Sequence, residues 1–326
     1  MIRFLHHVGL SVPDLEVGRA FYEAFGLEAR VSGEHLVLRC KGRGQDQVRL
    51  MPGSPKTLSY VAYGTDAAGM KQVRKSLKSH NVALEDAPFD IDSQGIWFRD
   101  PSNDWVHVCE GVAAPSAPRP TPEVNTHGRY RRIGQRACDL KSSSRVASPL
   151  RLGHLIKFSP DVDKSIQFYT QVLGMKVSDR AGDILGFLRF GCGGDHHALG
   201  LAKSSHSGLH HLSFEVMDID EIEMGAQSLV AKGYTSAFGL GRHVGGSNYF
   251  HYIRDPWNSL VEYFWDIDVI PEDDSDWVPL NAAGPHELAA VWSVGPPKED
   301  FAQNYEVPEG FDATPGMALT EALANG

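Results

Sequence analysis

The chain has 326 residues, 42% hydrophobic and 22% charged, a composition typical of a globular protein with about two domains. Its formal net charge of −10 argues against nucleic acid or an anionic membrane as the main partner. No apolar run could span a bilayer, the N-terminus lacks a signal-peptide core, and the four cysteines form no C-x-x-C pair. We therefore expect a cytoplasmic protein with neither disulfides nor a zinc ribbon.

The first predicted elements are a strand and an amphipathic helix, and the same pair recurs in the middle of the chain. FLHHVGLSVPDLEVGRAFYEAFGLEA from Phe4 aligns with RLGHLIKFSPDVDKSIQFYTQVLGMKV from Arg151, so that His7 corresponds to His154. In both copies an aspartate after the strand is placed to cap the helix, and a glycine is placed to end it. An internal repeat of this length decides the architecture.

The repeat continues beyond each helix. TLSYVAYGTDAAGMKQVRKSL from Thr57 resembles GLHHLSFEVMDIDEIEMGAQSL from Gly208, again a strand followed by a helix. Two strands joined by an Asp-Pro-x-Asn turn come next, in GIWFRDPSNDWVHVCEG from Gly95 and in YFHYIRDPWNSLVEYFW from Tyr249. The chain therefore contains four strand–helix–strands units, arranged as two halves of similar size.

The repeat also predicts the domain boundaries. We expect an N-terminal domain over residues 1–112, a linker rich in Pro, Ala, Ser and Arg over 113–149, and a C-terminal domain over 150–268. A tail with many prolines and acids, residues 269–326, is expected to lie on the body and to fray after Pro308.

Corresponding positions of the two halves carry different side chains. Those of the N-terminal half are His7, Tyr60 and His107. Those of the C-terminal half are two histidines and a glutamate on three separate strands: His154, His211 and Glu262. Two histidines and one carboxylate form the facial triad of non-haem Fe(II), which leaves positions open for substrate and dioxygen. Each residue alone is typical of ordinary structural use, but their matching repeat positions favour a metal site in the C-terminal half only.

The motifs GHL, GLHHLSFEV and DPWNSLVEYF resemble the three metal-ligand strands of type I extradiol (meta-cleaving) catechol dioxygenases, in the vicinal oxygen chelate superfamily. The resemblance to these enzymes, similar to 2,3-dihydroxybiphenyl and catechol 2,3-dioxygenases, covers about Met1 to Asp266. It implies an α+β fold in which four βαβββ modules pair into two cup-like, incomplete barrels. It also implies that His154, His211 and Glu262 bind Fe(II), with Mn(II) acceptable to the same ligand types.

The resemblance further implies three residues beside the metal. DHHALGLA matches the strand that carries a histidine next to the dioxygen site, which places that role on His197. GRHVGGSNYFHYIRDP matches the segment that carries a second histidine and a tyrosine, His243 and Tyr252. His197 would stabilise reduced dioxygen and handle protons, and the other two would hydrogen-bond the substrate oxygen. The expected partners are a catechol-type substrate and O2, without nucleic acid or membrane, and we expect a homo-oligomer.

The adjacent histidines of GLHHLSFEV have to be told apart. Strict strand alternation puts His210 on an apolar face with Leu212 and Phe214, and puts His211 on the polar face with Ser213. We therefore expect His211 to bind the metal and His210 to pack away from it.

Two other functions stay open. One is a glyoxalase-like, metal-dependent isomerase or lyase of the same superfamily, and the other is a metal-free small-molecule-binding protein of the resistance type. The first would not need His197, His243 and Tyr252 together, and the intact set of two histidines and a glutamate argues against the second. The sequence does not specify the catechol: three aromatic residues, Phe238, Tyr249 and Trp257, are candidate walls, and no arginine stands out as a partner for a substrate carboxylate.

Overall fold

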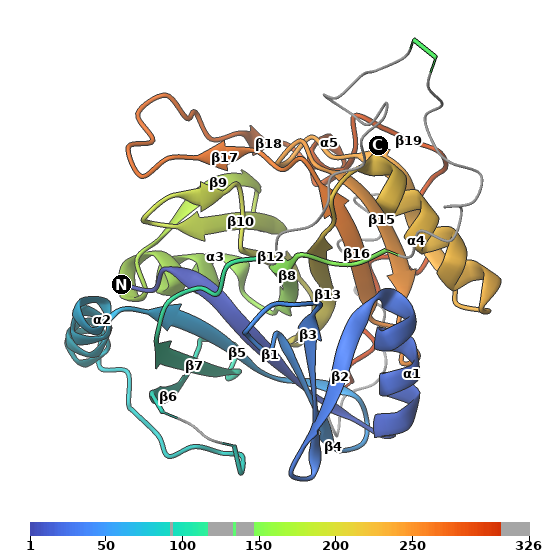
Figure 1. Cartoon of the computed structure of the whole chain (residues 1–326). Coiled ribbons are helices and arrows are strands. Elements are labelled where there is room, and N and C mark those ends of the chain that lie inside the picture. Colours follow the sequence, from blue (N-terminus) through green and yellow to red (C-terminus); the bar gives the residue numbers. More distant parts are fainter. Residues whose placement is uncertain (92–93, 117–132, 135–146, 308–326) are drawn as a thin grey trace.

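A computed structural model describes residues 1–91, 94–116, 133–134 and 147–307 of the chain. Its strands form two large sheets, one in each half of the sequence, as the repeat predicts (Figure 1). The sheets and their helices follow an α+β arrangement, and the boundaries of the predicted domains stay a prediction. No helix in the described part of the chain is long and apolar enough to cross a membrane.

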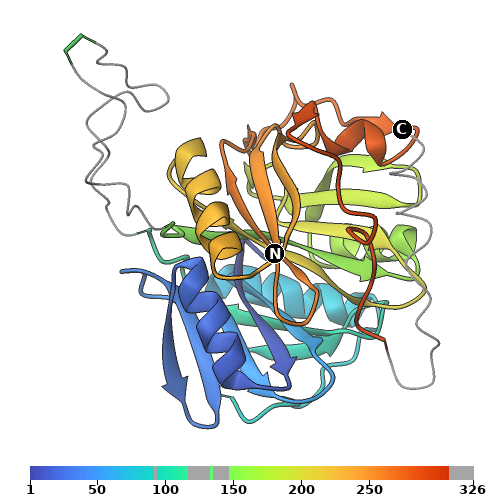
Figure 2. The ribbon, with the colours of Figure 1, turned by 90° about the vertical axis from the view of Figure 1, so that its right-hand side faces the viewer.

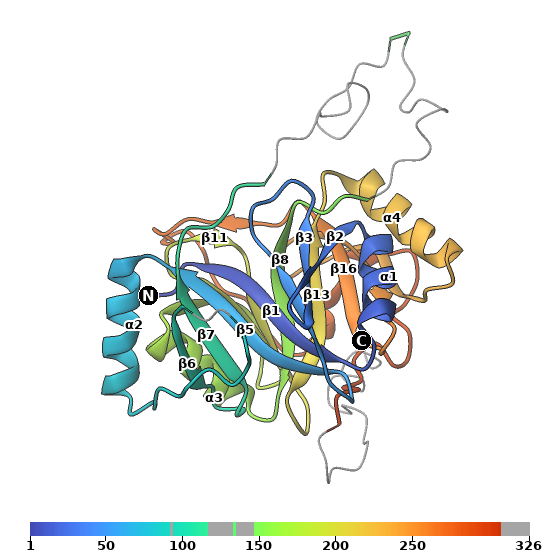
Figure 3. The same cartoon turned by 60° about the horizontal axis from the view of Figure 1, so that its bottom comes forward.

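The N-terminal half forms a 7-stranded sheet in the order β2-β3-β4-β1-β5-β7-β6 (Figure 3). Its elements are β1 (Phe4–Val12), α1 (Leu15–Phe25), β2 (Leu27–Ser32), β3 (His35–Cys40), β4 (Val48–Pro52), β5 (Thr57–Thr65), α2 (Ala67–Ser79), β6 (Ile96–Arg99) and β7 (Trp105–Glu110). The second unit of this half is shorter than expected: among its described residues, one bridge between Glu85 and Trp97 stands in place of the strand expected between α2 and β6.

The C-terminal half forms a 10-stranded sheet in the order β18-β9-β10-β12-β8-β13-β16-β15-β14-β19. Its repeat elements are β8 (Arg151–Ser159), α3 (Val162–Gln167) with a π-helical turn over Phe168–Val172, β9 (Met175–Ala181), β10 (Leu185–Phe190), β11 (Gly194–Asp195), β12 (Leu199–Lys203), β13 (Gly208–Glu215), α4 (Ile219–Ala231), β14 (Ser236–Arg242), β15 (Tyr249–Arg254) and β16 (Leu260–Trp265). The tail adds β17 (Val269–Ile270), β18 (Asn281–Ala282), α5 (His286–Ala289) and β19 (Trp292–Ser293).

Local sequence signals explain where the elements begin and end. The carboxylates of Asp14 and Asp161 accept hydrogen bonds from backbone N–H groups in the first turns of α1 and α3. Gly26 ends α1 with a φ of 108°, a left-handed conformation that a residue with a Cβ adopts only with strain. The predicted caps of these helices are confirmed.

The two Asp-Pro-x-Asn turns fold identically in the two halves. Asp100 accepts backbone hydrogen bonds from two residues of its turn, and Asp255 does the same in the other half. Asn103 and Asn258 follow with φ of 65° and 72°, the left-handed region that asparagine tolerates. The turns join β6 to β7 and β15 to β16, so they fix the register of the strand that carries Glu262.

Buried contacts join the two halves into one body. The Phe25 ring stacks on Tyr263 at 4.0 Å between centroids, and the Tyr263 hydroxyl donates to the Phe25 carbonyl oxygen. The fully buried Lys157 ammonium of β8 lies between the carboxylates of Asp100 and Asp104 from the N-terminal half. Because a buried ammonium is stable only when it is paired, this contact fixes how the halves dock.

The tail is tied to both halves (Figure 2). Its strands β18 and β19 extend opposite edges of the C-terminal sheet. Farther along, Asn304 donates to the backbone carbonyl oxygens of His206 and Ser207. Glu306 then reaches the N-terminal half, where its carboxylate accepts hydrogen bonds from Lys56 Nζ at 2.6 Å and from the backbone N–H of Leu58 at 2.8 Å.

We expect Glu306→Gln to destabilise the whole chain. The Lys56 and Glu306 side chains are only 3% and 5% exposed, so the variant removes the carboxylate that contacts a buried ammonium directly. The loss in the free energy of unfolding should be about 3 kcal/mol, measured by urea denaturation. Lys203→Gln is the matched control, because Lys203 pairs with Asp183 at the surface and should leave the midpoint nearly unchanged. Equal midpoints for the two variants would contradict a structural role for the buried pair.

Candidate functional site

Three neighbouring strands bring the predicted metal ligands together. His154 lies on β8, His211 on β13 and Glu262 on β16, and these strands are adjacent in the sheet. Ser213 of β13 pairs in register with both His154 and Glu262, so the side chains meet on one side of the sheet. One ligand atom from each residue lies within 4.8 Å of the other two, and all three residues are buried. In the described part of the chain, they form the one such group of histidines, cysteines and carboxylates.

The donor atoms of this group suit a divalent metal ion. Nε2 of His154 and of His211 lie 3.1 Å and 3.6 Å from Glu262 Oε2, and the buried Nε2 of His211 has no hydrogen-bond partner among the described residues. Burial lowers the pKa of His211 well below its usual value, which keeps the imidazole neutral. Burial opposes ionisation of Glu262, but contacts with the neighbouring histidines, the hydrogen bond from His154 first among them, outweigh burial and lower the pKa of the carboxyl. Two neutral imidazoles and one carboxylate fit the facial arrangement of a non-haem iron site.

The matching positions of the N-terminal half form a different cluster. His7 Nε2 lies 2.9 Å from the Tyr60 hydroxyl, so its ring nitrogen already has a protein partner. His107 stacks on the Trp97 ring at 4.3 Å between centroids. Among the described residues of this half, no three ligand-type side chains meet as His154, His211 and Glu262 do, and the absence of a metal from this half stays a prediction.

His107 makes stability depend on pH in a direction that can be tested. Burial lowers its pKa from 6.5 to about 4, so between these values the unfolded chain binds a proton that the folded chain does not. The free energy of unfolding should therefore fall as the pH falls through this window, by about 3 kcal/mol for this group. His107→Phe, which keeps a ring against Trp97, should lose that part of the pH dependence in urea denaturation at pH about 7.5 and about 4.5. An unchanged pH dependence would show that His107 is not the group responsible.

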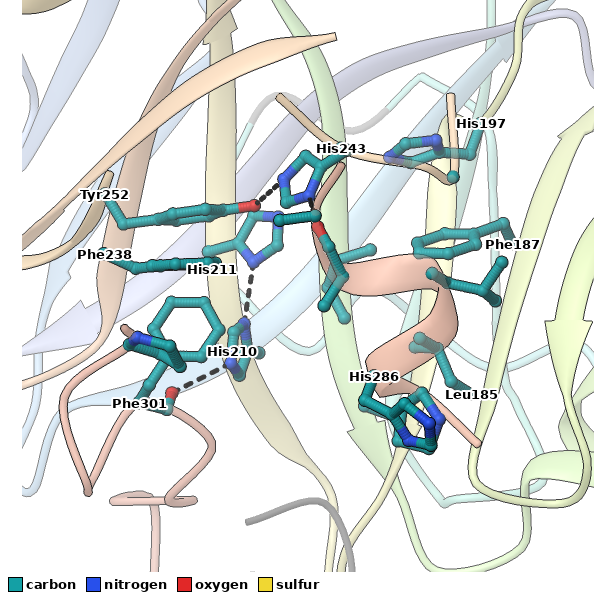
Figure 4. Close-up of a pocket in the computed structure, with 18 of the residues that line it drawn as sticks. Leu185, Phe187, His197, His210, His211, Phe238, His243, Tyr252, His286 and Phe301 are labelled. Carbon is teal, nitrogen blue, oxygen red and sulfur yellow. Dashed lines mark hydrogen bonds between the residues drawn. The ribbon is translucent and has the colours of Figure 1, made fainter. Parts of the chain in front are cut away.

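A cavity of about 290 Å³ opens over the predicted metal ligands (Figure 4). His154 and His211 line it together with His197, His243 and Tyr252, so the three residues predicted to act beside the metal do converge there. Its walls are largely apolar: Ile156, Leu185, Phe187, Ala202, Phe238, Leu288, Ala289, Ala290, Pro297 and Phe301. None of the described residues that line it is a lysine, arginine, aspartate or glutamate.

His243 and Tyr252 form a hydrogen-bonded pair at one side of the cavity. His243 Nδ1 donates to the backbone carbonyl oxygen of Ala289, which leaves Nε2 to accept from the Tyr252 hydroxyl at 2.9 Å. Burial, followed by the negative charge of Glu262, raises the pKa of Tyr252 well above its usual value. The tyrosine therefore keeps its proton at neutral pH and can donate it in a hydrogen bond.

His197 lies on the far side of His243 from Tyr252 (Figure 4). Its ring is 4.2 Å from the His154 ring and 4.6 Å from the Phe187 ring, measured between centroids. Burial, and then the charge of neighbouring histidines, lowers the pKa of His197 well below its usual value. A neutral imidazole in an apolar recess can hold or accept one proton close to the predicted metal.

The expectation that His210 turns away from the cup is wrong. A β-bulge between Leu209 and His211 interrupts the alternation of β13 against β8, and both histidines line the cavity. Nδ1 of His210 lies 2.7 Å from Nδ1 of His211, and its Nε2 donates to the Phe301 carbonyl oxygen at 3.0 Å. Both of its ring nitrogens are thus engaged, and His210 braces the His211 ring against the tail.

The walls of the cavity were mostly missed by sequence reasoning. Of the three predicted aromatic walls only Phe238 lines it; Tyr249 stacks on Trp265, and Trp257 packs against Gly18 of α1. Phe187 lies on β10, and Phe301 belongs to the tail. A tail with few regular elements carries no periodicity that would predict its contacts.

Comparison with known proteins places the fold and the family. Residues 151–263 match the Glyoxalase/Bleomycin resistance protein/Dioxygenase superfamily. A Mn(II)-bound glyoxalase from Novosphingobium aromaticivorans superposes with a TM-score of 0.75 at 22% identity, covering 95% of this chain and 97% of that one. BphC, a halotolerant catechol dioxygenase, superposes with a TM-score of 0.71 at 19% identity, covering 90% and 95%. At these identities the two structures support the fold alone.

A sequence relative shows the family as well as the fold. Metapyrocatechase 2 of Cupriavidus necator is 35% identical over 306 residues, which cover 94% of this chain and 93% of that protein. The match therefore includes both halves and most of the tail. With this identity over nearly the full length of both proteins, the chain belongs to the extradiol ring-cleaving dioxygenases of the glyoxalase/bleomycin resistance protein/dioxygenase superfamily.

Proposed function

We propose that this chain opens the ring of a catechol-type substrate next to its two hydroxyl groups, with Fe(II) held by His154, His211 and Glu262. The observation that supports the proposal most is the meeting of three buried ligand atoms at a cavity that His197, His243 and Tyr252 also line. A bound metal ion would supply adjacent sites for the catechol oxygens and O2, and the electron transfer that joins them. A divalent metal ion held by two neutral imidazoles and one carboxylate would carry a net charge of +1, which a singly deprotonated catechol would cancel.

The chain's own residues prepare and protect this reaction. His243 Nε2, held in place by the bond from its Nδ1 to Ala289, is directed toward Tyr252 and can accept the first hydroxyl proton of the catechol. The Tyr252 hydroxyl then donates a hydrogen bond to the resulting phenolate oxygen. His197 lies on the side of the cavity away from Tyr252. There it can hold or accept a proton where O2 reacts. The apolar walls keep water away from the reacting groups.

The cavity lining also favours a class of substrate. Because neither lysine nor arginine lines the cavity among the described residues, a ring substituent that carries a carboxylate would find neither of these cations as a partner. We therefore propose catechols with no substituent or a neutral, apolar one. We also propose that the chain acts as a homo-oligomer, which light scattering would test.

The rival functions predict different chemistry at the same site. A glyoxalase-like isomerase moves protons without consuming O2, and a resistance-type protein binds its ligand without metal. The buried Nε2 of His211, which has no hydrogen-bond partner in the part of the chain that the structure describes, favours a metal site over metal-free binding. The set of His197, His243 and Tyr252 favours oxygen chemistry over isomerisation.

Anaerobic reconstitution tests the proposal. Metal-free protein is loaded with Fe(II) or, in parallel, Mn(II), and each sample is mixed in air with catechol, 3-methylcatechol and 3,4-dihydroxybenzoate. We expect a coloured ring-fission product from the two neutral catechols with Fe(II), and little from the carboxylated one. Activity with Mn(II) alone would overturn the iron assignment, and inert protein with either metal would overturn the proposed function.

A further inference from the structure

A buried chain of three side chains leads from a carboxylate to His197. Asp179 of β9 places Oδ2 2.9 Å from His196 Nε2, and His196 Nδ1 lies 3.0 Å from His197 Nδ1. All three side chains are buried, and His196 is completely so. Neither Asp179 nor His196 lines the cavity, so neither can touch the substrate.

The other contacts of this chain leave little freedom to rotate. The second oxygen of Asp179, Oδ1, accepts from the backbone N–H of Leu280 in the tail at 2.7 Å. The His196 ring packs against Trp277, at 5.3 Å between centroids. The backbone of His196 is also fixed, because its N–H donates to Asp268 and its carbonyl oxygen accepts from Ser178. Ring flips of His196 would lose the bond to Asp179.

The direction of each hydrogen bond follows from the carboxylate. An ionised carboxylate only accepts, so His196 Nε2 carries the proton and donates to Asp179. With its proton at Nε2, the His196 ring offers its lone pair at Nδ1, and the proton between the two rings belongs to His197 Nδ1. A neutral His197 with its proton at Nδ1 has a bare Nε2. Among the described residues that Nε2 has no hydrogen-bond partner, and its ring lines the cavity.

We propose that Asp179 is a positioning residue that acts through His196 and makes His197 present an unprotonated Nε2 to the substrate. This inference rests on the proposed function, in which His197 handles a proton beside the predicted metal. With Nε2 bare, His197 can accept a hydrogen bond from an O–H group in the cavity, whereas a protonated Nε2 could only donate one.

Asp179→Asn should reverse the direction of the hydrogen bonds from residue 179 through His196 to His197 without moving the side chains. The Leu280 N–H still requires an acceptor and holds the amide oxygen, so the NH2 group faces His196 and donates to its Nε2. His196 must then carry its proton at Nδ1, and His197 must carry its own at Nε2, where it can no longer accept. We expect kcat to fall about 100-fold while KM stays within about twofold. Iron content should not change, because Asp179 touches none of the three predicted ligands.

Matched variants separate positioning from packing. Trp277→Phe changes the packing on the same His196 ring without touching the proton chain, so its kcat should stay within about twofold of wild type. The double variant D179N with His197→Phe should be no slower than His197→Phe alone, because both act through one nitrogen. If D179N does not fold, His196→Phe interrupts the same chain and should lower kcat by a similar factor. Wild-type kcat in D179N, or equal losses in D179N and Trp277→Phe, would overturn the inference.

A spectroscopic readout tests the inference apart from turnover. In ¹⁵N-histidine-labelled, metal-free protein, the ¹⁵N signals of His197, assigned by their loss in His197→Phe, show which ring nitrogen is protonated. We expect the proton at Nδ1 in wild type and at Nε2 in D179N. The same proton position in both proteins would overturn the inference even if the enzyme cleaves catechols. If the proton of His197 moves from Nδ1 to Nε2 as expected but the protein cleaves no catechol, the proposed function is wrong and the inference about the hydrogen bonds is still supported.

Discussion

Replacing Glu262 by alanine should abolish iron binding and ring cleavage together. Glu262 is the one anionic member of the predicted ligand group, and it is fully buried between His154 and His211. Its loss removes the charge that holds a divalent cation in a dry site and leaves two neutral imidazoles. We expect the affinity for Fe(II) to fall by more than about 100-fold, with no detectable product at stoichiometric metal.

Anaerobic metal titration followed by elemental analysis measures this loss. Glu223→Gln is the matched control: it removes a glutamate charge that contacts His251 on the outer side of the sheet, and it should keep full iron content. Tight iron binding by Glu262→Ala would show that the carboxylate is not a ligand. Circular dichroism of the metal-free variant checks that the loss does not come from unfolding, since Ser213 and Asn248 also bond to this carboxylate.

Replacing His197 by phenylalanine should separate metal binding from oxygen chemistry. The new ring fits beside Phe187, so the variant keeps the apolar recess and loses only the ring nitrogens. Iron content and the KM for catechol should stay close to wild type, because the three predicted ligands and the His243–Tyr252 pair are untouched. We expect kcat to fall by roughly 100- to 1,000-fold, the effect of removing a positioned acid–base group.

Single-turnover experiments locate the affected step. The variant is loaded with Fe(II) and catechol without air, and oxygen is then added in a stopped-flow mixer. Normal catechol binding followed by slow product formation agrees with a role in proton handling. Turnover at the wild-type rate would remove His197 from the mechanism, and loss of iron would make it a residue that supports the metal site instead.

Much of the architecture could be predicted because the chain repeats itself. The Asp-Pro-x-Asn turns and the aligned strands fix register within each half, and register decides which side chains share a face. The same comparison set Tyr60 against His211 and so predicted that only the C-terminal half has a metal group. The shortened second unit of the N-terminal half was missed, because a strand reduced to one bridge keeps no alternating pattern.

Two features of the site lay beyond what the sequence can predict. Strict alternation fails at β-bulges, and the bulge at His211 brings His210 to the cavity when the pattern directs it away. The tail contributes Leu288 and Phe301 to the walls and Leu280 to the contacts of Asp179. Its position depends on tertiary contacts such as that of Glu306 with Lys56, which are far apart in the sequence and follow no local signal.

The most direct test of the central claim is to measure oxygen consumption and product mass in one reaction with 3-methylcatechol. Fe(II)-loaded protein should consume one O2 for each catechol and give a single coloured product whose mass equals that of the substrate plus both oxygen atoms. A product of unchanged mass formed without oxygen consumption would instead identify an isomerase. Tight catechol binding with neither oxygen uptake nor a new product would identify a binding protein, and either result would contradict ring cleavage by this chain.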